Sequence, residues 1–491
     1  MEKKPSHDRD PRPPAPKSSG APATAETGWL PDLVYTGEKF EAGLAFFADA
    51  LGRITRFSRE PADLAMARRL VGQAALPGLV NTHAHCFHRL VRGRAELRGR
   101  ADRDARTPWR NALERVASRV TAEDVFDVAR MTFMEMLLSG ITCVGEFHYL
   151  HHPPDGQPAP GPNHLAQEVI RAAHDVGIRI ALLRVAWSRA GFGAPAEAAP
   201  PRFDTGPTER CLRDTDALHQ WVGQNFPTDE AWVGMGVAGL AQVPLESLKT
   251  IAAHARSQRF RLHVQLAATA EENAACRAEY GRTPVALLAE HGIVDKRFTA
   301  VDAIHLSEEE IKILGTARAT ACVCPVTAAN LGLGLVPVEA LAAAGAGVAL
   351  GTDSHGQIDL LQEARVLEYA LRLAGSRRPG LAADPATALF HTATVTGARS
   401  LGSTGGALEV GRPADFFTVN LFDPALAGSD AGSLLAHVVL ALERRAVREV
   451  WIGARQRLVN GRHALHGPIV GRFVEVQQRV WAGGESGPVV R

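Results

Sequence analysis

A pair of histidines at the end of a short apolar segment is the feature of this sequence that most directly suggests chemistry. The segment reads Leu76-Pro-Gly-Leu-Val-Asn-Thr-His-Ala-His85. If residues 79–84 form a β-strand, its two-residue period places His83 and His85 on the same face. Two imidazoles side by side at the carboxyl end of a strand suit a divalent metal ion. An isolated His-x-His more often marks only the end of a strand, but the preceding apolar strand favours a metal site here.

The remaining chain has the pattern needed to carry such a site. It has 491 residues, of which 46% are hydrophobic, so it exceeds one ordinary domain and can bury a large core. Strand-like apolar segments alternate with amphipathic helical segments, which is typical of a parallel sheet. About eight strands over roughly 320 residues favour a (β/α)8 barrel over an open sheet. The predicted strands are residues 79–84, 141–149, 178–183, 232–237, 261–265, 298–304, 319–324 and 347–350.

Short strands and turns return at both ends of the chain. We predict a small β-sandwich domain built from residues 28–74 and 403–473, joined to a hydrolase-like barrel of residues 75–402. Residues 1–27 are rich in Lys, Pro, Ser and Ala and lack hydrophobic periodicity, so they are predicted to form a disordered tail. The fold class predicted from the sequence is therefore α/β, with a barrel and a second, smaller β domain.

The overall composition argues against several classes of function. A formal net charge of +1 argues against a nucleic-acid or membrane-surface role based on bulk electrostatics. The six cysteines are sparse and irregularly spaced, so no disulfide framework is expected, and we interpret Cys322 and Cys324 as buried thiols. No secretory signal and no apolar run long enough to span a membrane is found in the sequence. We expect a cytoplasmic protein that binds a small molecule, with a homodimer among the assemblies left open.

Three passages of the sequence together resemble the amidohydrolase superfamily. They are Pro77-Gly-Leu-Val-Asn-Thr-His-Ala-His85, Gly351-Thr-Asp-Ser354 and Gly411-Arg-Pro-Ala-Asp415. The resemblance implies a distorted β/α barrel with a β-sandwich built from both termini. Longer passages are similar to the formimidoylglutamate deiminases, which release ammonia from N-formimino-L-glutamate in histidine degradation. These passages include Glu146-Phe-His-Tyr-Leu-His-His-Pro-Pro-Asp-Gly156, Arg189-Ala-Gly-Phe-Gly193 and Ala329-Asn-Leu-Gly332.

The resemblance implies one divalent metal ion, usually zinc, at the mouth of the barrel. His83, His85 and Asp353 match the family's metal ligands, and Asp353 would also take part in catalysis. In the family the ion lowers the pKa of a water molecule, so that hydroxide forms near neutral pH. Taken alone, Arg110 fits a solvated surface charge equally well. By resemblance, the residues that would contact the substrate are Arg110, Tyr149 and His88.

The sequence departs from the family pattern on the fifth and sixth barrel strands. The fifth strand of the family carries a metal-binding histidine and, three residues later, a proton-transferring glutamate; here these positions are Gln265 and Ala268. On the sixth strand a catalytic histidine is replaced by Asp302. His263 survives two residues before Gln265, on the same face of a regular strand but deeper in the barrel. The histidine and arginine that the family carries after its fourth strand are also missing.

These substitutions leave three functions open. The first is a formimidoylglutamate deiminase, or a relative that hydrolyses another C–N bond, with protons transferred by Asp302, His263, His88 or Glu146. The second is a non-catalytic homologue that binds a small ligand or a partner protein, and the third is a purely structural subunit. A missing general acid or base lowers a rate about 10²- to 10⁴-fold, so ordinary deiminase activity is expected to be feeble or absent. Gln265 is a weak ligand for zinc, so weak metal binding and an empty site both stay open.

Overall fold

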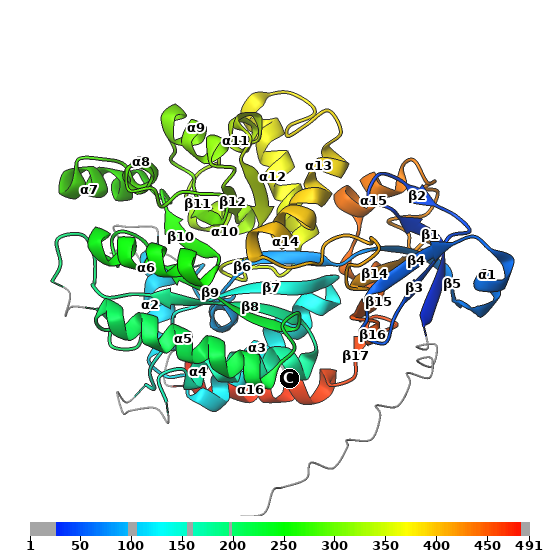
Figure 1. Cartoon of the computed structure of the whole chain (residues 1–491), viewed down its shortest axis with the longest axis horizontal. Coiled ribbons are helices and arrows are strands. Elements are labelled where there is room, and N and C mark those ends of the chain that lie inside the picture. Colours follow the sequence, from blue (N-terminus) through cyan, green and yellow to red (C-terminus); the bar gives the residue numbers. More distant parts are fainter. Residues whose placement is uncertain (1–25, 97–105, 155–160, 196–198, 483–491) are drawn as a thin grey trace, which may run out of the picture.

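Eight parallel strands form one sheet that closes almost completely into a barrel (Figure 1). The computed structural model of the chain describes residues 26–96, 106–154, 161–195 and 199–482. The barrel predicted from the sequence is confirmed, because the strands neighbour one another in chain order and pair in parallel. Its strands are β6 (Leu79–Ala84), β7 (Ile141–His148), β8 (Arg179–Ala186), β9 (Ala231–Val237), β10 (Leu262–Leu266), β11 (Phe298–Asp302), β12 (Thr320–Val323) and β13 (Gly347–Leu350).

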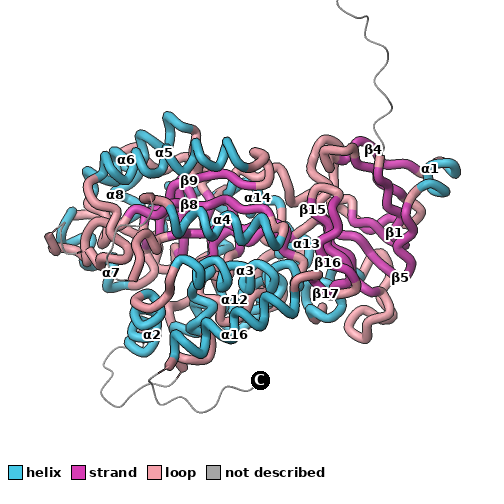
Figure 2. The backbone as a smooth tube through the Cα atoms, turned by 90° about the horizontal axis from the view of Figure 1, so that it is seen from below, coloured by secondary structure: helices cyan, strands magenta, loops and turns pink. Residues whose placement is uncertain are grey.

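Helices surround the barrel strands (Figure 2). Thr121 and Asp124 form a reciprocal capping box at the start of α3, which fixes where that helix begins. Gly177 ends α4 in the left-handed conformation, with φ of 85°. These helices are α2 (Thr107–Ala117), α3 (Ala122–Leu138), α4 (His164–Val176), α5 (Thr208–Asn225), α6 (Leu245–Gln258), α7 (Ala270–Tyr280), α8 (Pro284–Glu290), α9 (Glu308–Thr316), α10 (Pro325–Leu331), α11 (Val338–Ala344), α12 (Leu360–Gly375), α13 (Pro385–Thr392) and α14 (Val395–Leu401).

The barrel closes where the first strand meets the segment that follows the last strand. Ala84 and Asp353 form an isolated parallel bridge. The carbonyl oxygen of His83 accepts hydrogen bonds from the backbone N–H groups of Thr352, at 2.9 Å, and Asp353, at 3.1 Å. The closure therefore brings two distant parts of the sequence into contact at the carboxyl end of the strands.

The two chain ends form a separate β domain beside the barrel, as predicted (Figure 1). Its strands are hydrogen-bonded into a single mixed nine-stranded sheet, in which β5 joins the N-terminal part to β14 of the C-terminal part. Trp29 packs against Phe46, Phe416 and Trp451, with ring centroids 5.2–5.3 Å away. The strands are β1 (Thr27–Tyr35), β2 (Phe40–Glu41), β3 (Ala45–Ala48), β4 (Ile54–Ser58), β5 (Arg68–Pro77), β14 (Phe416–Asn420), β15 (Val447–Ile452), β16 (Arg455–Val459) and β17 (Arg462–His463), with helices α1 (Pro61–Met66) and α15 (Leu434–Ala441).

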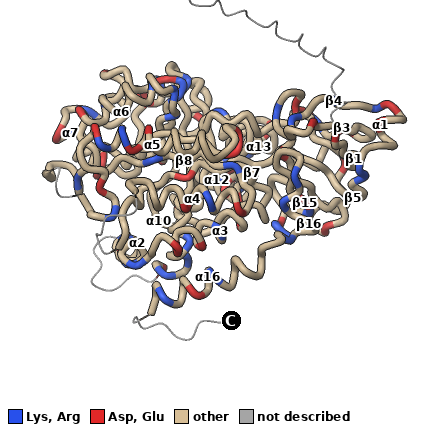
Figure 3. The backbone as a smooth tube through the Cα atoms, turned by 60° about the horizontal axis from the view of Figure 1, so that its bottom comes forward, with Lys and Arg blue, Asp and Glu red and all other residues tan. Residues whose placement is uncertain are grey.

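The C-terminal helix α16 (His466–Trp481) leaves the β domain and packs on α3 of the barrel. Arg472 Nε lies 3.1 Å from Asp127 Oδ2, and Arg479 pairs with Asp124. Basic and acidic residues are interspersed along α16 and over the rest of the described chain (Figure 3). The segment predicted to complete the β domain, residues 403–473, thus ends inside a helix that contacts the barrel.

Two further expectations concern the chain ends and membranes. The tail predicted for residues 1–27 falls outside the described residues except for its last two, and Thr27 already belongs to β1. Within the described parts of the chain, no helix is both long and apolar enough to cross a bilayer.

A buried ion pair joins the barrel to the β domain and provides a test of how the two are held together. Arg179 Nε lies 2.6 Å from Asp415 Oδ2, and Arg179 Nη2 lies 2.9 Å from Asp415 Oδ1. Both side chains are at most 4% exposed. Asp415→Asn should lower the free energy of unfolding in urea by about 3–5 kcal/mol, because it removes the buried partner of the Arg179 guanidinium and leaves only the more exposed carboxylate of Asp229 at 3.4 Å.

The matched control for this prediction removes a carboxylate of the same kind from an exposed pair. Glu290 Oε1 lies 2.8 Å from Arg282 Nε, and both side chains are about half exposed. Glu290→Gln should change the free energy of unfolding by no more than ~0.5 kcal/mol. A loss of less than about 1 kcal/mol in Asp415→Asn would contradict the prediction.

Candidate metal centre at the barrel mouth

Three polar side chains converge at the carboxyl end of the barrel strands. His83 lies in β6, His85 follows it, and Asp353 comes from the segment after β13. Asp353 Oδ1 lies 3.2 Å from His85 Nε2 and 3.7 Å from His83 Nε2. One ligand atom from each residue lies within 4.8 Å of the others. The three side chains are almost completely buried and form a candidate metal site of two imidazole nitrogens and one carboxylate oxygen.

The hydrogen bonds around these side chains leave lone pairs that face one another. His85 Nδ1 lies 2.8 Å from the carbonyl oxygen of Phe147, which can only accept, so Nδ1 carries the proton. In the neutral ring, His85 Nε2 is then a lone-pair acceptor that faces the carboxylate of Asp353. Within the described residues, neither ring nitrogen of His83 has a hydrogen-bond partner, and burial lowers the pKa of His83 to about 4. A cation among His83 Nε2, His85 Nε2 and Asp353 Oδ1 would satisfy these three atoms, so the residues fit a divalent metal ion.

An aromatic wall lies directly beside His85. His88 belongs to the short 3-10 helix Cys86–Val91, and its Nε2 lies 2.6 Å from the hydroxyl oxygen of Tyr149. The ring centroids of His85 and His88 are 4.3 Å apart, and those of His85 and Tyr149 are 5.2 Å apart. Burial raises the pKa of the Tyr149 hydroxyl well above its usual range, so the group stays protonated and donates to His88. Two of the three residues predicted to contact a substrate, His88 and Tyr149, therefore lie next to a candidate metal ligand.

Arg110 does not share this buried position. It lies on α2 with an exposed side chain, whereas its neighbour Trp109 reaches the His88 ring at a centroid distance of 5.4 Å. The loop of residues 97–105, which precedes the helix, lies outside the described residues. The structure brings Tyr149 and His88 together and leaves Arg110 exposed, so its role in holding a substrate stays a prediction.

The fifth barrel strand, β10, carries two of the positions that differ from the family pattern. Gln265 is half-buried on this strand, and Ala268 follows its end with only a methyl group. His263 is completely buried, and its Nε2 lies 3.4 Å from the carbonyl oxygen of Ser400 in α14. Among the described residues, the cluster of potential metal ligands does not include His263. This histidine is directed to α14 rather than to the candidate metal site.

Asp302, which replaces the histidine of the sixth strand, is a buried carboxyl group at the end of β11. It has a left-handed backbone conformation with φ of 70°. Burial, followed by the negative charges of Asp353 and Glu272, raises the pKa of Asp302 well above its usual range. Burial also opposes ionisation of Asp353, but the adjacent rings of His83 and His85, whose protonated forms would donate to this carboxylate, hold the pKa of Asp353 well below its usual range. The pKa values of these two carboxyl groups are therefore shifted in opposite directions.

Two ionisable groups near the site carry little signal in the sequence. His355 is buried, and its Nδ1 lies 3.1 Å from Thr352 Oγ1. Its Nε2 has no hydrogen-bond partner in the described part of the chain, and its only sequence signal is its position two residues after Asp353. Glu272 lies in the first turn of α7, where acidic residues are common caps. Its Oε2 accepts a hydrogen bond from the backbone N–H of Ala268 at 2.9 Å. The carboxyl group of Glu272 therefore lies beside Ala268, whose own side chain has no carboxyl group.

Glu146 is the third carboxyl group near the histidines. Its Oε1 accepts a 2.7 Å hydrogen bond from the backbone N–H of Cys86, and its Oε2 is buried without a partner among the described residues. Burial raises the pKa of Glu146 to about 7, against a smaller opposing effect of that hydrogen bond and of His85. The sequence pointed to this residue as one of several alternatives for proton transfer, and the geometry leaves it suitable for that role.

An apolar cavity adjoins Asp302 and Cys324. It has a volume of about 390 Å³ and extends between α10 and α12. Its walls are mostly aliphatic side chains and small residues, including Ile304, Leu335 and Leu367, and no basic residue is among the described residues that line it. Such a cavity suits an apolar group better than a carboxylate.

Comparison with known proteins places these observations in context. The model of the "Amidohydrolase family" matches residues 74–464 of this chain. Formimidoylglutamate deiminase of Pseudomonas aeruginosa is 34% identical over 417 residues, which cover 84% of this chain and 90% of that protein. The 8-oxoguanine deaminase of the same organism is 31% identical over 392 residues, covering 79% of this chain and 82% of that protein.

Solved structures show the same architecture. The crystal structure of an amidohydrolase from Brucella melitensis has a TM-score of 0.84 and 28% identity, and the match covers 93% of this chain and all of that chain. An adenosine deaminase from Xanthomonas campestris, solved with bound zinc, has a TM-score of 0.78 and 22% identity over 92% of this chain and 98% of that chain. The second likeness concerns the fold alone.

The candidate metal site predicts a specific loss of bound metal on substitution. Wild-type protein purified in the presence of zinc should contain about one zinc ion per chain, measured by elemental analysis. His83→Ala should remove most of this zinc, because it leaves one imidazole and one carboxylate. The control His254→Ala removes a histidine that lies 2.8 Å from Asp216 and outside the cluster, and it should leave the zinc content unchanged. Equal zinc contents in all three proteins would contradict the metal site.

Proposed function

Because the chain belongs to the amidohydrolase family, we propose that it is a metal-dependent hydrolase that cleaves a C–N bond of a small molecule. The observation that carries this proposal is the set of ligand atoms of His83, His85 and Asp353 that face one another while almost completely buried. Two imidazoles and one carboxylate are a ligand set used by catalytic zinc. When bound, the ion supplies an acidified water molecule as a source of hydroxide near neutral pH.

Hydrolysis of a formimino or amidino group requires proton transfer as well as a nucleophile. The water oxygen stays on carbon as the new carbonyl, and both water protons end on the nitrogen that leaves as ammonia. A group that accepts and returns a proton must therefore lie near the reacting atoms. We assign this role to Asp302, because burial and the nearby charge of Asp353 raise the pKa of its carboxyl group and so make its carboxylate a stronger proton acceptor. Glu146, with a pKa of about 7, is the second group suited to proton transfer.

The substrate that fits best is a small C–N compound with an apolar group. The cavity beside Asp302 and Cys324 is mostly apolar, and the described residues that line it include no arginine or lysine to pair with a glutamyl carboxylate. Gln265 and Ala268 also occupy the two positions at which, by resemblance, formimidoylglutamate deiminases carry a metal-binding histidine and a proton-transferring glutamate. Because relatives of similar identity are named for different substrates, the family permits such a change.

A second function rests on the same two positions. If no other residue replaces the histidine and glutamate that are missing at Gln265 and Ala268, the barrel binds a small ligand at the metal centre without hydrolysing it. The two functions differ in one measurable property, the release of ammonia.

The first experiment tests the substrate change. Zinc-loaded wild-type protein should release ammonia from N-formimino-L-glutamate feebly or not at all. The combined substitutions Gln265→His, Ala268→Glu and Asp302→His should raise the rate at least ~10²-fold, because they restore a ligand, a proton carrier and an electrostatic group. Each single substitution should fail, and the triple variant should show a high KM because no histidine and arginine follow the fourth strand. Robust wild-type turnover that His83→Ala abolishes would contradict the proposed change of substrate.

The second experiment separates catalysis from binding. Zinc-loaded wild-type protein should release ammonia from at least one member of a panel of small amidines and amino-substituted heterocycles with apolar groups. Asp302→Asn should lower that rate about 10²- to 10⁴-fold at unchanged zinc content. Stable binding of panel compounds without any release of ammonia would instead support the non-catalytic function.

A further inference from the structure

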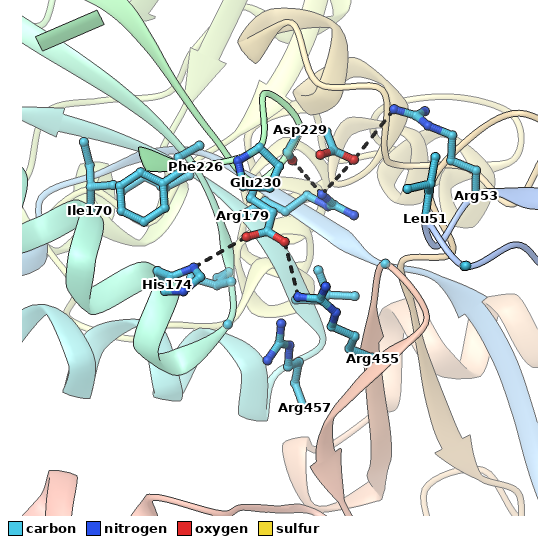
Figure 4. Close-up of a pocket in the computed structure, with 18 residues that line it drawn as sticks. Leu51, Arg53, Ile170, His174, Arg179, Phe226, Asp229, Glu230, Arg455 and Arg457 are labelled. Atoms are coloured by element: carbon cyan, nitrogen blue, oxygen red, sulfur yellow. Dashed lines mark hydrogen bonds and ion pairs between the residues drawn. The ribbon is translucent and has the colours of Figure 1, made fainter. Parts of the chain in front are cut away.

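A second cavity lies at the opposite end of the barrel from the candidate metal site. It has a volume of about 220 Å³ and is lined by the N-terminal ends of β8 and β9, the end of α4 and the turn between β15 and β16. Figure 4 shows its charged side chains around a common space. Because β8 is eight residues long, this cavity lies roughly 25 Å from the mouth of the barrel. It is therefore separate from the site proposed for hydrolysis.

Three of the four arginines that line this cavity have carboxylate partners. Arg179 forms the buried pair with Asp415 described above and lies 3.4 Å from Asp229. Arg53 Nη2 lies 3.7 Å from the same Asp229 carboxylate, and Arg455 Nη1 lies 3.4 Å from a carboxylate oxygen of Glu230. The second oxygen of Glu230 faces the ring of His174 at 3.5 Å (Figure 4). The acidic groups of the cavity are thus already engaged.

Arg457 is the fourth arginine, and its charge has no partner. No hydrogen bond or ion pair joins it to any described residue, and its Nε is buried without an acceptor. Its guanidinium lies against Gly177, where an added Cβ would come within 2.5 Å of the guanidinium carbon. Burial, followed by repulsion from Arg455, lowers the pKa of Arg457, although the group stays charged at neutral pH. Arg455 and Arg457 both border the cavity in Figure 4.

We propose that this cavity binds a small organic oxyanion, with the Arg457 guanidinium as its anchor. A planar guanidinium presents paired N–H donors that match the oxygens of a carboxylate or phosphate. Apolar side chains also line the cavity, with Ile170 and Phe226 on one side and Leu51 on the other, and they are available to cover the body of such a molecule. Arg457 is partly buried, and its Nε is buried without an acceptor; an anion seated in the cavity would supply that acceptor and a counter-charge.

The position of the cavity gives the bound anion a structural effect. Arg457 belongs to β16 of the β domain, whereas Gly177 and Ile170 belong to the barrel. A ligand in contact with both would couple the two domains and stabilise the folded chain by mass action. This site does not require the candidate metal centre to be active, so the two proposals can fail independently.

Titration calorimetry of the full chain with sodium phosphate, and separately with sodium benzoate, tests the proposal. Sodium chloride of equal ionic strength provides the reference. At least one anion should bind the wild type, and its affinity should fall about tenfold or more in Arg457→Met. Preference for phosphate or for benzoate identifies which oxyanion the cavity takes. The bound anion should also raise the thermal midpoint of the wild type.

The matched control is Arg462→Met, which removes an exposed arginine from the neighbouring strand β17 and should leave the affinity unchanged. If Arg457→Met fails to fold, Arg457→Gln keeps a polar side chain without the charge and should show the same loss. If neither anion binds the wild type at concentrations up to about 10 mM, the proposal is overturned. A dissociation constant of that size is about 100-fold weaker than one of 0.1 mM. Equal affinities of the wild type and the folded Arg457 variant also overturn it, because the anion then binds elsewhere.

Discussion

The backbone contact that closes the barrel is the constraint on which the rest of the structure depends. The carbonyl oxygen of His83 accepts hydrogen bonds from Thr352 and Asp353 at 2.9 and 3.1 Å. These two bonds join the first strand to the segment after the last strand and so complete the barrel. They also place the Asp353 carboxylate beside the imidazoles of His83 and His85. The same short contact therefore determines both the architecture and the candidate metal site.

This arrangement concentrates groups that are unfavourable to bury. The pKa values of His83 and Asp353 are lowered and that of Asp302 is raised, each by a different balance of burial and neighbouring charge. Asp302, Asp353 and His355 all adopt left-handed backbone conformations, at φ of 70°, 37° and 56°. Such conformations cost about 1–3 kcal/mol each and persist only where the surrounding structure imposes them. These left-handed residues lie together at one end of the barrel, where the pKa values of Asp302 and Asp353 are also shifted in opposite directions. Such a combination is typical of a functional site rather than of an apolar core.

The two ends of the barrel present opposite electrostatic situations. At the mouth, the acceptor atoms of His85 and Asp353 face each other across 3.2 Å, and a cation is the group that satisfies them. At the opposite end, the charge of Arg179 is paired with that of Asp415, whereas Arg457 has no ion-pair partner among the described residues and borders a partly enclosed cavity. There an anion is the complementary group. The β domain contributes to the second of these environments directly, because Arg457 and Asp415 both come from it.

Local sequence patterns determined the strands and helices of this protein, because periodicity and caps act over a few residues. The strand 79–84, with His83 and His85 on one face, followed from the two-residue period alone, and Asp353 was identified by resemblance. Only the tertiary structure decided which side chains meet: closure of the barrel set the 3.2 Å contact of Asp353 with His85. The path of the chain likewise turned His263 toward Ser400. The raised pKa of Asp302 depends on burial and on charges that are distant in sequence, which no local pattern records.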